Sequence, residues 1–97
     1  MTEKDVSGYE QRAKKGVNEI SSLQNEVSDS NFREKILVPT LRHFEDAAEG
    51  CRLWRQSQYS GWVRFIYLSL QLGESSLKQI RDDISKYGGP ENIVAIG

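Results

Sequence analysis

The chain has 97 residues, of which 37% are hydrophobic and 28% are charged, and its formal net charge is −1. This length accommodates one domain spanning 1–97, and the low apolar fraction suits a small helical bundle with a narrow apolar seam, or a subunit that completes its core with a partner. The charge balance gives no overall electrostatic basis for binding nucleic acid, and the single cysteine excludes a scaffold of intrachain disulfides.

The sequence indicates no membrane segment. Its first residues lack the apolar run of a signal peptide. The longest apolar-rich stretch, 62–72, spans 11 residues and contains Arg64, so it is too short and too polar to cross a bilayer. We therefore expect a cytoplasmic protein that does not enter the membrane.

A first helix is predicted over 6–28. Two sets of small or apolar residues repeat every seven positions and form a narrow seam at coiled-coil spacing. They are Val6, Ala13, Ile20 and Val27 in one set, and Tyr9, Gly16 and Leu23 in the other. The start of this helix has two candidate capping boxes, Thr2 with Asp5 and Ser7 with Glu10.

A second helix is predicted over 31–57, after a polar break at 28–31. Asn31 with Glu34 has the spacing of an N-cap and its capping-box partner. Pro39 interrupts the apolar pattern and removes one backbone donor. We expect a kink at this proline; the alternative is a new helix that begins there.

The third helix, over 61–87, has conflicting signals. Leucines and polar residues alternate at 68–72, which is typical of a strand, whereas apolar residues from Trp62 to Ile84 also recur at helical steps. A lone strand would have little to pair with, so we expect a continuous helix that ends at the turn 87–90.

These elements predict an all-α fold, a three-helix antiparallel bundle with a kinked second helix and a short extended C-terminal tail at 88–97. The stretch 62–72 is apolar on most sides, so we expect it to lie centrally in the bundle. If it does not, its surplus apolar surface would favour a homodimer.

Catalytic and metal-binding patterns are weak. His43 is the only histidine, and with Asp46 it supplies too few ligands for a firm metal site. Cys51 falls on the apolar stripe of the second helix, where a structural role is expected. No nucleophile elbow or phosphate-binding glycine loop is present in the sequence. We expect neither an enzyme nor a bound cofactor or metal.

A segment rich in arginine and aromatic residues is the main functional signal. Residues 50–73 contain no acidic side chain but hold five of the nine aromatics. Such composition is typical of a contact surface, and also of a core segment whose arginines lie at its edge. The predicted contact residues are Arg52, Trp54, Arg55, Tyr59, Trp62 and Arg64.

We expect a non-enzymatic interaction module: a small adaptor, regulatory subunit or inhibitor that binds an acidic or mixed surface of another protein. The alternative is a nucleic-acid-binding subunit of a larger complex, although three arginines make a narrow basic footprint.

Two short motifs resemble those of the WXG100 class of small secreted proteins. Tyr87 and Glu91 match the form of the export signal of that class, and Ser60-Gly61-Trp62 holds the residues of its Trp-x-Gly turn in a different order. The resemblance implies a hairpin of two antiparallel helices that pairs as a dimer and is exported. The turn lies well past the middle of the chain, and a second break precedes it at 28–31.

Overall fold

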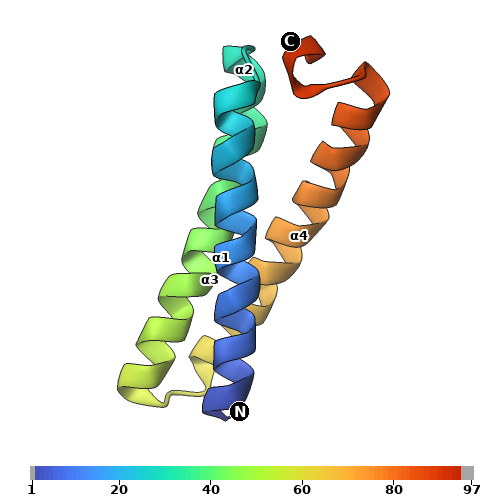
Figure 1. Cartoon of the computed structure of the whole chain (residues 1–97). Coiled ribbons are helices and arrows are strands. Elements are labelled where there is room, and N and C mark those ends of the chain that lie inside the picture. The colour runs from blue at the N-terminus through green and yellow to red at the C-terminus, as the bar shows by residue number, and fades with distance from the viewer. Residues whose placement is uncertain (1, 95–97) are drawn as a thin grey trace.

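The protein is an elongated bundle of three long helices, seen in a computed structural model that describes residues 2–94. Helices α1 (Glu3–Glu26), α3 (Val38–Ser57) and α4 (Gly61–Tyr87) run up, down and up along the long axis (Figure 1). The predicted all-α antiparallel bundle, with its kinked second helix and short tail, is confirmed. The two-helix hairpin implied by the WXG100 resemblance is not the fold observed.

Helix α1 begins three residues earlier than predicted because the outer of the two candidate capping boxes forms. The Asp5 amide donates to the Thr2 hydroxyl at 3.3 Å, and the Thr2 amide donates to the Asp5 carboxylate at 3.1 Å. The heptad seam faces the core as expected, and Val6, Ile20 and Val27 are buried.

The second helix is helical throughout but changes its winding before Pro39. The short α2 (Ser30–Phe32) leads into a π-helical turn, η1 (Arg33–Leu37), and then into α3. The cap of α2 is Asp29, which accepts from the Phe32 amide at 2.8 Å, so the prediction that Asn31 caps this helix is wrong. Pro39 follows the π turn, in the first turn of α3. Both π turns and prolines are common causes of local kinks in helices.

Helix α4 is continuous, which settles the choice between strand and helix at 62–72. It ends where Gly88 and Gly89 adopt positive φ angles of 81° and 145°, as the glycine pair predicts. A 3₁₀ turn, η2 (Pro90–Asn92), then returns the chain so that Ile93 is buried in the core. The predicted tail also included 95–97, which lie outside the described residues.

Helix α3, rather than α4, occupies the central position. It packs along both α1 and α4, while α1 and α4 meet over a much shorter length. The expectation that 62–72 lies centrally is therefore wrong, because not all apolar residues of α4 face another helix. One face of α4 packs on α3, and other apolar residues of the helix remain exposed.

Phe44 of α3 is closely packed, and its ring lies between glycines of the other two helices. A Cβ atom at Gly16 of α1 would lie 2.5 Å from the ring Cγ, and one at Gly73 of α4 would lie 3.0 Å from ring carbons. The absence of a side chain at Gly16 therefore allows α1 to approach this buried ring closely, and Gly73 allows α4 to contact its other side.

Candidate contact surface at the turn between α3 and α4

The segment 50–73 comprises the end of α3, the turn at 58–60 and the first half of α4 (Figure 1). All six predicted contact residues lie at this end of the bundle. Their environments differ so much that they do not form one surface.

The two tryptophans contribute to packing. Trp54 is 5% exposed and belongs to the core. Trp62 is half-buried against the core, and its ring meets Phe65 edge to face with centroids 5.6 Å apart. In this structure Trp54 cannot contact a partner.

Arg55 joins α3 to α1. Its Nε donates to Glu3 and its Nη1 donates to Glu10, each at 2.7 Å. The hydrogen bond to Glu10, and to a smaller extent the one to Glu3, raises the pKa of Arg55 above its usual value. The same hydrogen bond from Arg55 lowers the pKa of Glu10. The pairs span 52 and 45 positions of sequence, so this arginine holds two distant helices together.

The other two arginines point to solvent. Arg52 donates through Nε to Glu49 of the same helix at 3.0 Å, and this contact raises the pKa of Arg52. Arg64 is exposed and has no ion pair or hydrogen-bonded side-chain partner within residues 2–94. Of the three arginines, Arg64 alone has a charge that the described chain does not neutralise.

Tyr59 lies in the turn and is 65% exposed. Its ring covers Gly61, where a Cβ atom would lie 2.9 Å from Cζ of the tyrosine. Tyr59 and Arg64 are thus two predicted contact residues that are exposed and have no ion-pair partner in the described chain.

Sequence reasoning did not identify an exposed apolar row on α4, formed by Phe65, Leu68 and Leu72 and called here the α4 row. These side chains are 39%, 45% and 55% exposed. Their spacing of three and four residues places them along one side of the helix. That spacing is visible in the sequence, but the helical pattern from Trp62 to Ile84 does not show which apolar residues of the helix face the core and which face solvent.

The α4 row is flanked by α3 on one side and by Arg64 on the other. A Cβ atom at Gly50 of α3 would lie 3.0 Å from the Phe65 ring, which places this ring at the seam between the two helices. Arg64 precedes Leu68 by four residues, so the two side chains share a face of α4.

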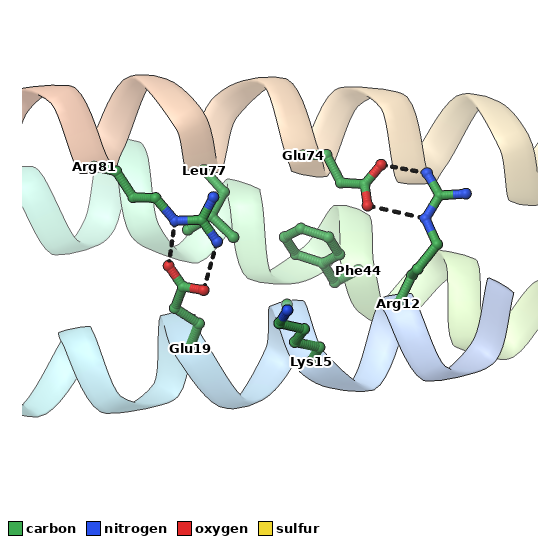
Figure 2. Close-up of a pocket in the computed structure, with 8 residues that line it drawn as sticks. Arg12, Lys15, Glu19, Phe44, Glu74, Leu77 and Arg81 are labelled. Carbon is green, nitrogen blue, oxygen red and sulfur yellow. Dashed lines mark hydrogen bonds and ion pairs between the residues drawn. The ribbon is translucent and has the colours of Figure 1, made fainter. Parts of the chain in front are cut away.

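A separate hollow of about 260 Å³ lies between α1 and α4 (Figure 2). Its floor includes Phe44 and Leu77, and two ion pairs that join the helices close its ends. They are Arg12 with Glu74, and Arg81 with Glu19 at 2.6 Å. Hydrogen bonding to Arg81 lowers the pKa of Glu19. These two ion pairs join α1 to α4. Lys15 adds one further positive charge at the rim of the hollow.

Neither His43 nor Cys51 lies in a cluster of possible catalytic or metal-binding side chains of the described residues. His43 is half-buried beside Asp46 on a shallow hollow at the surface of α3. The Cys51 thiol is buried, its Sγ lies 3.8 Å from the Val6 carbonyl oxygen, and burial raises its pKa. Within residues 2–94 no three side chains of the metal-ligating types come together.

Comparison of the chain with known protein families, with curated proteins and with solved structures gives no match. In the part of the chain that the structure describes, no helix has the length and apolar character needed to cross a membrane.

Proposed function

We propose that this protein is a non-enzymatic interaction module, an adaptor, regulatory subunit or inhibitor, that binds another protein through the outer side of α4. The observation that carries the proposal is the α4 row, in which Phe65, Leu68 and Leu72 line up in solvent beside the unpaired Arg64. Apolar and aromatic side chains next to an arginine are the residue types that contribute most to binding at protein interfaces.

The position of the row supports a role other than folding. The opposite face of α4 already supplies the core with Ile66, Leu70 and Ile80, all buried. The row therefore adds apolar surface that the bundle does not use, and surface of this kind is often functional.

The size of the row limits the strength of binding. Three side chains about half exposed present roughly 300 Å² of surface, against the roughly 800 Å² that each partner buries in a standard interface. A stable complex therefore needs the partner to cover the polar flanks as well, including Tyr59 and Arg64.

The structure does not favour binding of nucleic acid. Of the three arginines that suggested it, Arg55 and Arg52 are engaged by carboxylates of the chain itself. The remaining Arg64 provides a much smaller basic footprint than such binding requires.

Photo-crosslinking in cells tests the proposal. A photoreactive p-benzoylphenylalanine in place of Leu72 should give one adduct with another protein, whereas the same group in place of Ser22, an exposed residue of α1, should give none. Adding Leu68→Glu should remove the adduct and leave the helical circular dichroism unchanged, because Leu68 lies outside the core.

Three results would contradict the proposal. The first is an absence of adducts from position 72. The second is the same set of adducts from positions 72 and 22. The third is an adduct with a second copy of the chain and with no other protein.

A further inference from the structure

The sequence segment that contains the α4 row carries charge of one sign. Residues 50–73 contain no Asp or Glu, and Arg64 lies one helical turn before Leu68. Since Arg52 and Arg55 are paired within the chain, the positive charge available to a partner at this face is that of Arg64. An occupant that brings a carboxylate close to Arg64 would complement both the apolar and the charged part of the surface.

A second copy of the chain that pairs through its own α4 does not supply that carboxylate while it also covers the row. In an antiparallel pair of α4 helices that cross at Leu68, Phe65 of one copy faces Gln71 of the other, next to Leu72, and Arg64 faces Leu72. Glu74 lies only two residues from that register but is already paired with Arg12. The register that brings Arg64 to Asp82 requires a slide of about ten residues, or about 15 Å, which places Leu68 opposite Lys78. The alignment of the two helices that covers the α4 row is therefore different from the alignment that brings Arg64 to a carboxylate.

A parallel pair of copies is no better. Equivalent residues of the two chains then lie side by side, so Arg64 approaches its own counterpart across the contact. Like charges brought together in this way disfavour the pair.

We propose that the α4 row receives an amphipathic helix of a different protein, which carries an aspartate or glutamate positioned against Arg64. Its apolar residues repeat at steps of three and four, so that they lie along Phe65, Leu68 and Leu72, and its acidic side chain flanks that stripe. This proposal rests on the proposed function and specifies the chemistry of the partner.

Two synthetic helical peptides of about 18 residues, roughly five turns, provide the probe. Both carry leucines at the same steps of three and four. One has glutamates and the other lysines at the positions that flank the leucines. Fluorescence anisotropy at low salt measures the binding of each peptide to the full chain.

The glutamate peptide should bind roughly 3- to 10-fold more tightly than the lysine peptide, and the difference should shrink as salt screens it. Arg64→Glu should reverse the preference. Lys78→Glu is the matched control: it makes the same change of charge on an exposed residue of the same helix, away from the row, and should preserve the preference. Leu68→Gln should weaken both peptides.

Three results would overturn the inference. They are equal binding of the two peptides, a preference that Arg64→Glu does not alter, and no binding of either peptide. If position 72 still gives a photo-crosslinked adduct with another protein in these cases, the proposed function stands and the inference of an acidic helical partner is refuted.

Sedimentation of the chain alone provides a further test. The chain should remain monomeric, whereas a dimer that Leu68→Gln dissociates would identify a second copy as the occupant and overturn the inference.

Discussion

The packing of Phe44 between two glycines predicts that a single added methyl group at Gly16 destabilises the bundle. The methyl carbon of Gly16→Ala would lie 2.5 Å from the ring Cγ and closer still to two other ring carbons. The ring cannot simply retreat, because Gly73 of α4 lies against its other side. The helices must separate or the ring must leave its preferred position.

Two opposing contributions set the size of the effect. Replacing glycine by alanine inside a helix stabilises it by about 1 kcal/mol, while overpacking a close-packed core costs about 1–3 kcal/mol. The contact at Gly16 is severe, so we expect a net loss of about 2 kcal/mol, or roughly 8–16 °C in Tm for a domain of this size. At Gly73 the closest distances are 3.0 Å, and Gly73→Ala should be nearly neutral.

Urea unfolding followed by tryptophan fluorescence measures these changes, since Trp54 passes from the core to water. Gly8→Ala is the matched control, because nothing lies within 4 Å of a Cβ atom at this exposed position of α1. This variant should be more stable than the parent by about 0.5–1 kcal/mol. Combining Gly16→Ala with Phe44→Leu should recover part of the loss relative to the sum of the single changes.

The reasoning is refuted if Gly16→Ala is as stable as Gly8→Ala. In that case the ring can relax without cost, and the three helices are not held at their spacing by this contact.

Two further predictions concern the ion pairs and the tryptophan. The pKa values of Glu10 and Glu19 are lowered from 4.5 by arginine partners, so their contribution to stability is present above about pH 4.5 and is lost as pH falls through the lower native values. The urea concentration at the midpoint of unfolding should decrease as the pH is lowered from 6 to 3. The decrease should be smaller in the double variant Glu10→Gln, Glu19→Gln, and an equal decrease in both proteins would contradict this. Trp54→Ala should cost about 3–5 kcal/mol of unfolding free energy, whereas Tyr59→Ala should stay within about 0.5 kcal/mol. Similar losses for the two variants would show that Trp54 is not the core residue described above.

The helices of this protein follow from local sequence signals. Heptad spacing over 6–27, the glycine pair at 88–89 and the helical steps from Trp62 to Ile84 depend on residues close in sequence, and these predictions are confirmed. The capping of α2 by Asp29 instead of Asn31 shows the limit of such signals, because two neighbouring polar residues are equally good caps on composition alone.

The arrangement of the helices was harder to predict from the sequence. The sequence shows that the stretch 62–72 is apolar on several sides, but it does not show whether those sides meet helices or water. The structure gives the central place to α3, which uses Phe44 against both neighbours, and leaves Leu68 and Leu72 exposed on α4.

The availability of the predicted contact residues to a partner also depends on how the helices are arranged. Arg55 belongs to the predicted contact segment by composition, but its carboxylate partners Glu3 and Glu10 lie about 50 positions earlier and meet it only through the fold. Whether an arginine is available to a partner depends on such distant contacts. Arg64 could therefore be separated from Arg52 and Arg55 only after the helices were placed.

The odd number of long helices has a mechanical consequence. The described chain starts at one end of the bundle and its tail lies at the other, and the long axis of the bundle measures 44 Å (Figure 1). A force applied through the two ends therefore loads the helix interfaces in shear, so that contacts along a whole helix must give way together. An even number of helices would bring the ends to the same side, and the same force would peel the helices apart one contact at a time.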